Sequence, residues 1–202
     1  MKLHEAAPAP NCRRVRIFFA EKGIEVPIEP VDIVKAENRQ PPFLAKNPLG
    51  GVPVLELDDG TCIAESVAIC RYIEETHPDP PLMGVDPLDK AVVEMWNRRM
   101  ELELALPVMN VFRHSHPFFA GRLEQVPEWS EASRRLVETR MEWLDRELAE
   151  REFVAGDRYT IADITALVGV DFGRVSKISI PEALGNLKRW HQAVSGRPSA
   201  EA

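Results

Sequence analysis

Hydrophobic and polar positions change their spacing near residue 80. Before it, short apolar runs alternate with brief amphipathic stretches, and after it apolar positions recur at helical spacing over long segments. The first part therefore predicts short strands and helices in the order β-α-β-α-β-β-α, which describes a small domain with a mixed sheet. The strands are expected at 1–6, 25–33, 53–59 and 61–64, and the helices at 11–23, 42–47 and 65–78.

The second part of the chain predicts almost only helix. The stretch "HPDPPLMGVDP" holds four of the 17 prolines and is typical of a linker. We therefore expect an α+β protein with a first domain at 1–78, a linker at 79–86 and an all-helical domain at 87–202. Its helices are expected at 87–116 with a bend at Pro107, 127–150, 160–178 and 181–199.

Composition and charge exclude several classes of function. The formal net charge of −7 argues against a nucleic-acid surface. No segment has the eighteen or so consecutive apolar residues that a membrane span needs, and the N-terminus lacks the apolar centre of a signal peptide. The three cysteines and the histidines have no metal-ligand spacing, so we expect no metal and a reducing compartment, the cytoplasm.

Several segments together resemble the glutathione transferases. The segment "NPLGGVPVLELDDGTCIAES" is similar to their glutathione-binding segment, "VAGDRYTIADI" to the turn that opens their central helix, and "LKRWHQAVSGRPS" to their closing helix. The order is right over nearly the whole chain. The phrases "FLAKN", "VPVLELDDGT" and "ELEL" favour the fungal and bacterial members that lack the usual catalytic Tyr, Ser or Cys. The resemblance implies a thioredoxin-like first domain, glutathione as co-substrate, a role in detoxification, and a homodimer.

Glu65 and Ser66 at the start of a predicted helix suit the charged end of glutathione. The Glu65 carboxylate can pair with the γ-glutamyl ammonium, and the Ser66 hydroxyl and N–H, at the positive end of the helix, can hold its carboxylate. The resemblance implies that Val52 precedes a cis Pro53 and that the Val52 backbone pairs with the cysteinyl part. An ordinary helix cap uses the same residue types as Glu65-Ser66, and is the alternative.

Two further glutathione contacts are weaker candidates. Asn38 lies where related transferases place a residue near the glycine carboxylate, although an Asn in a surface loop is nearly as good an interpretation. Gly51, in the pair Gly50-Gly51, leaves only backbone N–H groups as donors.

The residue that activates the thiol departs from the better-known classes. The resemblance aligns their catalytic Ser or Cys with Ala9, which cannot donate a hydrogen bond. Asn11 can donate to the sulfur instead, as in bacterial transferases with a "TPN" stretch, or it can cap the helix. Cys12 lies in the first turn, where the helix field lowers a thiol pKa, or it is a small buried residue.

The segment "FRHSHPFF" at 112–119 supplies a third group of candidates. The resemblance implies that this helix end lines the electrophile pocket, where His114 helps to hold a water against the thiol. A polar helix end is the alternative. We assign Asn110 and Phe118 to the electrophile pocket, which the mixed polar and aromatic character suits.

Three functions remain open. The first is transfer of glutathione to a hydrophobic electrophile, the second is glutathione-dependent disulfide reduction, and the third is non-enzymatic binding of glutathione or a hydrophobe. Other conspicuous residues have structural interpretations: Thr160 and Asp163 form a capping-box pattern, and the tryptophans Trp96, Trp143 and Trp190 fit core packing.

Overall fold

A four-stranded mixed sheet organises the first part of the chain. The computed structural model describes residues 1–202 and divides into two units, one of Met1–Pro81 with Glu201–Ala202 and one of Leu82–Ala200. The strands are β1 (Lys2–Glu5), β2 (Ile28–Pro30), β3 (Val54–Glu56) and β4 (Cys62–Ala64), in the order β2-β1-β3-β4. β1 runs parallel to β2 and antiparallel to β3, and β3 runs antiparallel to β4. The predicted thioredoxin-like βαβαββα order is confirmed.

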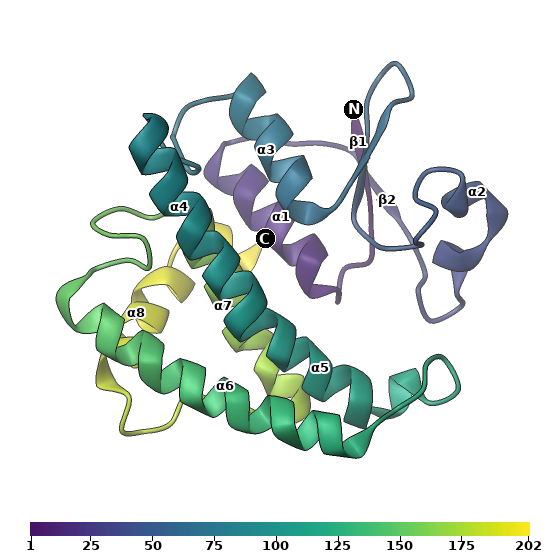
Figure 1. Ribbon diagram of the computed structural model, residues 1–202. Coiled ribbons are helices and arrows are strands. Elements are labelled where there is room, and N and C mark those ends of the chain that lie inside the picture. Colours follow the sequence, from purple (N-terminus) through teal and green to yellow (C-terminus); the bar gives the residue numbers. More distant parts are fainter. The chain divides into compact units, whose positions relative to one another are not determined.

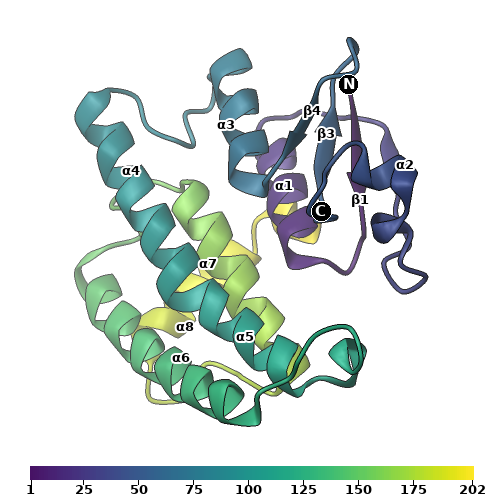
Figure 2. The same ribbon diagram turned by 45° about the vertical axis from the view of Figure 1, so that its right-hand side comes forward.

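Helices cover both faces of this sheet. The helices of the unit are α1 (Pro10–Glu21), the 3-10 turn η1 (Glu37–Arg39), α2 (Pro41–Leu44) and α3 (Ser66–Thr76). Figure 2 shows α1 and α3 on one side of the strands and α2 on the other. Under α2 lies a small core of Val31, Phe43 and Val54. The opposite face buries a larger set of side chains from α1 and α3, including Phe18, Ile69 and Ile73.

The second unit is entirely helical, as the sequence predicts, and Figure 1 labels its main helices. Its segments are α4 (Pro87–Arg99), the π-helical η2 (Met100–Ala105), α5 (Leu106–Ser115), η3 (Pro117–Phe119), α6 (Pro127–Glu147), η4 (Leu148–Glu150), α7 (Ile161–Phe172), η5 (Gly173–Ser176), α8 (Gly185–Ser195) and η6 (Pro198–Glu201).

The irregularity in the first long helix lies just before Pro107. The sequence predicted one helix over 87–116 with a bend at Pro107. In the structure, α4 continues into α5 through the π-helical segment η2, which closes with a bond from the Leu106 N–H to the Glu101 carbonyl. A proline lacks an N–H and its ring crowds the preceding turn, so a wider turn ahead of it accommodates both effects.

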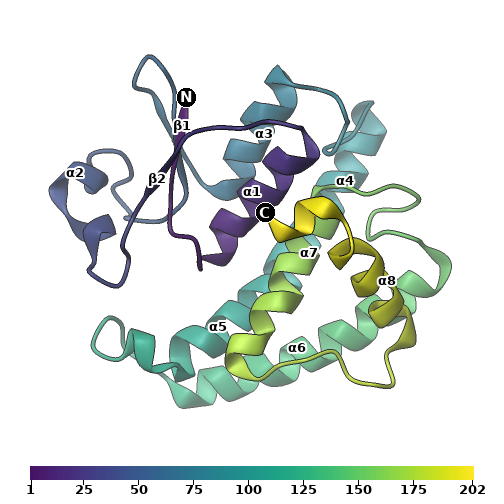
Figure 3. The same cartoon turned by 180° about the vertical axis from the view of Figure 1, so that it is seen from behind.

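α7 is the core of the helical unit, as its nearly all-round apolar pattern predicts. All ten residues from Ile161 to Val170 are buried, and α7 contacts α4, α5 and α8 (Figure 3). The predicted tryptophan packing holds for Trp190, which is fully buried, and for Trp96, which stacks on Trp143 with ring centroids 5.6 Å apart.

The start of α7 depends on one buried carboxylate. The predicted capping box is present: the Thr160 hydroxyl accepts a bond from the helix, and Asp163 accepts the Thr160 N–H at 2.9 Å. Asp163 also accepts the Val154 N–H at 2.8 Å and the Trp190 indole N–H at 2.9 Å. This carboxylate therefore joins the helix start, the preceding loop and α8.

The ionisation of Asp163 gives a pH dependence to folding. Burial raises the pKa of Asp163 to about 6, against the hydrogen bonds that lower it. The unfolded value is about 3.9, so folding takes up a proton between about pH 4 and pH 6. The stabilisation from this carboxyl is therefore present at low pH and is lost as the pH rises through about 6.

We predict that the free energy of unfolding of the wild type, minus that of Asp163→Asn, falls by up to about 3 kcal/mol between pH 4 and pH 7. The subtraction cancels the titration of other groups, and urea unfolding at a series of pH values measures it. A difference that stays constant or rises with pH would contradict this assignment.

Candidate functional site

The β3–β4 pairing brings two predicted binding segments together. Val54 pairs with Ala64 in the antiparallel ladder. Val52–Pro53 directly precedes β3, and Glu65 and Ser66 directly follow β4, so the pairing brings both segments to the same end of the ladder. The Val52–Pro53 peptide bond is cis, as the resemblance implied.

Side-chain amides and a guanidinium fix the loop that leads into Val52. The carbonyls of Leu49, Gly50 and Gly51 accept hydrogen bonds from Arg39 at 2.9 Å, Asn38 at 2.7 Å and Asn47 at 2.9 Å, respectively. Asn38 was predicted as a glutathione contact, and one of its amide hydrogens is therefore already bonded to the loop itself. Asn47 was not singled out from the sequence, because an Asn before a proline is an ordinary loop signal.

Gly50 is required by this geometry. It has a φ of +63°, and a Cβ added there would lie 2.7 Å from the Asn38 carbonyl oxygen. Gly51 has more room, with the nearest atom, the Asn47 amide nitrogen, at 3.3 Å. The conformation of this loop therefore depends on Gly50, whereas the sequence had indicated Gly51 as the candidate.

Glu65 and Ser66 do not act as a helix cap. Glu65 occupies the cap position of α3, but its side chain makes no capping hydrogen bond, and it is exposed without an ion-pair partner. Its backbone has φ +69° and ψ 117°, a conformation that costs a non-glycine residue on the order of 1–3 kcal/mol. Strain of this kind persists where the surrounding structure imposes it, and it is concentrated at functional sites.

The Ser66 hydroxyl is hydrogen-bonded to an arginine of α1. Ser66 is buried, and its Oγ accepts a hydrogen bond of 2.9 Å from the guanidinium of Arg14 on α1. Arg14 was not identified as a site residue from the sequence. The available signal was a charged residue at helical spacing from Ile17 and Phe18, on the face of α1 that is otherwise apolar.

At the start of α1, the candidates Asn11 and Cys12 have different surroundings. Ala9 is the cap residue and Pro10 the first helical residue, so Asn11 is not the cap. The Asn11 side chain is half-buried and makes no hydrogen bond within the protein, which leaves its amide available.

Cys12 is not an activated thiol. It is completely buried, and burial raises its pKa to about 12. The expectation that the helix field lowers this pKa is therefore wrong, because desolvation of the thiolate outweighs the field.

In the helical unit, Asn110 and His114 lie one turn apart on α5 and therefore on the same face. The Nδ1 of His114 accepts the Val126 N–H at 3.1 Å, and the Nδ1 of His116 accepts the Phe118 N–H at 3.1 Å. Both imidazoles thus anchor the loop that joins α5 to α6. Only the Nε2 atom of His114 remains for another partner.

Phe118 belongs to an aromatic cluster centred on Phe112. The ring of Phe112 lies 5.2 Å from that of Phe119 and 5.0 Å from that of Phe172, centroid to centroid. Phe118 lies 6.3 Å from Phe112 and carries the Arg122 guanidinium 4.3 Å above its ring. Phe112, Phe118 and Phe119 are all half-buried, so the cluster presents aromatic surface to solvent.

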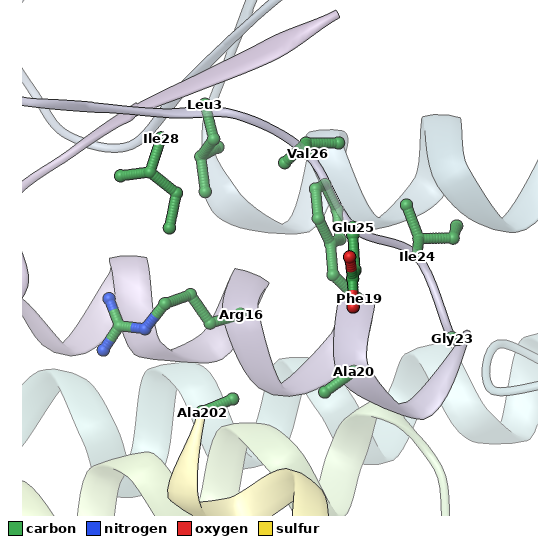
Figure 4. Close-up of a pocket in the computed structure, with 10 residues that line it drawn as sticks. All are labelled: Leu3, Arg16, Phe19, Ala20, Gly23, Ile24, Glu25, Val26, Ile28 and Ala202. Atoms are coloured by element: carbon green, nitrogen blue, oxygen red, sulfur yellow. The ribbon is translucent and has the colours of Figure 1, made fainter.

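A cavity of about 550 Å³ lies elsewhere in the first unit (Figure 4). It is lined by apolar side chains that include Phe19, Val26 and Ile28, together with Arg16. Arg16 is already bound to Glu5 at 2.5 Å and to the Ala7 carbonyl at 3.2 Å. None of the predicted glutathione residues lines this cavity.

No helix of the structure is both long enough and apolar enough to pass through a membrane.

Comparison with known proteins agrees with the geometry. Residues 3–81 match the family model of the glutathione S-transferase N-terminal domain, and residues 92–198 match that of the C-terminal domain. The chain is 40% identical over its whole length to glutathione S-transferase 2 of Saccharomyces cerevisiae, covering 88% of that protein.

Solved structures give the same result. A glutathione S-transferase domain-containing protein from Marinobacter aquaeolei superimposes with a TM-score of 0.95 at 42% identity, covering 98% of this chain and 99% of the other. The Gtt2-class glutathione S-transferase of Vibrio parahaemolyticus has a TM-score of 0.88 at 36% identity, covering 100% and 96%. The chain therefore belongs to the glutathione S-transferase family, and it is a glutathione transferase that uses glutathione as its co-substrate.

Proposed function

We propose that the first unit binds glutathione through Glu65, Ser66 and the backbone of Val52. Glu65 pairs with the γ-glutamyl ammonium, and the Ser66 hydroxyl and N–H hold the α-carboxylate at the start of α3. Val52, with Pro53 following, pairs with the cysteinyl part as an added strand. Gly51 and Asn38 flank the glycine end, where Asn38 has one amide hydrogen to offer beyond its bond to Gly50.

The observation that carries this proposal is the unused carboxylate of Glu65. It stands in a strained backbone conformation, makes no cap and has no cationic partner in the protein. An exposed carboxylate held in a strained conformation at the start of a helix suits a ligand that brings an ammonium group.

The thiol of the bound glutathione is activated, in this proposal, at the start of α1. Asn11 donates its free amide hydrogen to the sulfur, and the positive end of α1 adds to the stabilisation of the thiolate. Lowering the thiol pKa in this way requires no general base. His114 is the second candidate for a catalytic residue, through its Nε2 atom.

We infer a hydrophobic, preferentially aromatic electrophile. The half-buried rings around Phe112 support this choice, with Phe118 as a pocket residue and Asn110 as a polar contact. The cytoplasm is the compartment that fits three unpaired cysteines.

The buried Cys12 speaks against the alternative function of glutathione-dependent disulfide reduction. That chemistry with a protein nucleophile needs a thiolate that is accessible to solvent. Cys12 has no exposed surface and a pKa of about 12, so it is almost entirely protonated at neutral pH.

We further propose that the protein is a homodimer. Leu88, Met95, Leu102 and Leu106 are exposed along α4, η2 and α5, and they are spaced by seven, seven and four residues. This spacing forms one apolar stripe along the side of a helix, which a second copy would cover in a two-fold arrangement. Arg71, Arg98 and Arg99 are candidate polar contributors, although Arg98 and Arg99 already contact Glu101 and the Trp96 ring.

Glu65 variants test the binding proposal. We expect Glu65→Gln to weaken glutathione binding by about 2–4 kcal/mol, because the ligand ammonium loses its partner. Glu65→Gly should lose the same affinity while keeping or raising the melting temperature, since glycine adopts a positive φ without strain. Calorimetric titration and thermal unfolding measure the two effects. Glu25→Ala, which removes another exposed carboxylate of this unit, is the control, and unchanged affinity in both Glu65 variants would overturn the assignment.

Asn11 variants test the activation of the thiol. We expect Asn11→Ala to raise the pKa of bound glutathione and to slow conjugation of a chlorinated nitrobenzene by up to ~10²–10³-fold, with a smaller effect on binding. The decrease in rate is smaller if His114 or a water also stabilises the thiolate. The pH dependence of thiolate absorbance, measured in the wild type, Asn11→Ala and His114→Ala, reports the pKa directly. Cys12→Ala is the control, and a titration that only this variant alters would favour the redox function instead.

Charge placed on the apolar stripe tests the dimer. We expect Met95→Glu combined with Leu102→Glu to give a monomer at micromolar concentration in sedimentation experiments, because two like charges would meet across the two-fold axis. Val175→Glu introduces the same charge at another exposed apolar position and should remain dimeric. A wild type that sediments only as a monomer contradicts the proposal.

A further inference from the structure

Arg14 is a buried cation directly beneath the proposed carboxylate site. It lies on α1 with 2% of its surface exposed, in a stretch where Cys12, Val15, Ile17 and Phe18 are also buried. Its guanidinium donates to the Ser66 Oγ at 2.9 Å, and that bond is itself buried.

The bond from Arg14 determines which way the Ser66 hydroxyl points. A guanidinium can only donate, so the serine oxygen must accept from it. The single hydroxyl hydrogen of Ser66 is therefore free to be donated to another acceptor. At the start of α3, the acceptor that the proposed function supplies is the α-carboxylate of the γ-glutamyl group.

The positive charge of Arg14 extends along the first turns of α3. It lowers the pKa of the buried Cys70 thiol one turn further on, whereas burial, which is the larger effect, and the charge of Glu74 raise it. The acidic group on the same side, Glu74, is paired with Lys22 at 2.6 Å. Arg14 and Glu74 therefore both contribute to the electrostatics of the seam between α1 and α3.

We propose that Arg14 is a positioning residue for glutathione, which orients the Ser66 hydroxyl toward the α-carboxylate and places a positive charge behind it. This inference rests on the proposed binding of glutathione at Glu65 and Ser66. It assigns the recognition of the carboxylate to a pair of residues on two helices instead of to α3 alone.

The test compares two ligands: glutathione, and γ-aminobutyryl-cysteinyl-glycine, which lacks only the α-carboxylate. We expect the wild type to prefer glutathione, and Arg14→Met to raise the KM for glutathione by about 10- to 50-fold, as for the loss of a hydrogen bond to a charged group. The kcat should stay within about twofold, and the KM for the analogue should hardly change. Arg14→Lys, which keeps the charge, should restore part of the preference.

A double-mutant cycle with Ser66→Ala separates positioning from a merely structural role. If Arg14 acts through Ser66, the effects of Arg14→Met and Ser66→Ala on the KM for glutathione are far from additive. Arg16→Met is the matched control. It removes another arginine of α1 and the ion pair to Glu5, so it destabilises the same unit, but it should leave the preference for glutathione over the analogue intact.

The outcomes distinguish this inference from the proposed function. A wild type that binds both ligands equally contradicts the carboxylate site itself. A wild type that prefers glutathione through Ser66, together with an Arg14→Met variant that keeps the preference, overturns only the role of Arg14. If Arg14→Met does not fold, Arg14→Lys is the deciding variant. The inference is overturned if Arg14→Lys keeps the full preference for glutathione over the analogue and if adding Ser66→Ala to it has a purely additive effect on the KM.

Discussion

The antiparallel pairing of β3 with β4 is the constraint on which the proposed binding site depends. It is three residue pairs long, yet it brings the cis Val52–Pro53 peptide to the same end of the ladder as Glu65 and Ser66, which are twelve or more residues away in sequence. Everything else around the site supports this alignment. Asn38, Arg39 and Asn47 hold three successive carbonyls on one side of it, and Arg14 holds the Ser66 hydroxyl on the other.

The site is stabilised by its surroundings and not by its own residues. Glu65 has an unfavourable backbone conformation, which costs stability in the free protein. This conformation makes physical sense in the proposed function, where the exposed Glu65 carboxylate meets the ammonium of the γ-glutamyl group.

In the helical unit, a single buried side chain joins several segments. Asp163 accepts hydrogen bonds from the start of α7, from the loop at Val154 and from Trp190 on α8. One carboxylate thus fixes three segments around a helix that is buried on all sides. At the end of α5, the phenylalanines around Phe112 form an aromatic surface, and two histidines anchor the loop that follows. Loops of this kind commonly carry functional residues.

The sequence by itself determined the two-part architecture, the order of the elements, the capping box of α7 and the family, because periodicity, turn residues and local motifs are properties of neighbouring residues. It also indicated Glu65 and Ser66, since their segment carries a dense local pattern. Only the tertiary structure decided the rest. Asn11 is not the cap because the chain enters α1 at Ala9, and Cys12 is not reactive because burial outweighs the helix field. Arg14 reaches Ser66 across 52 residues of sequence. Desolvation and long-range contacts of this kind depend on what the fold places around a side chain, and no spacing along the chain encodes them.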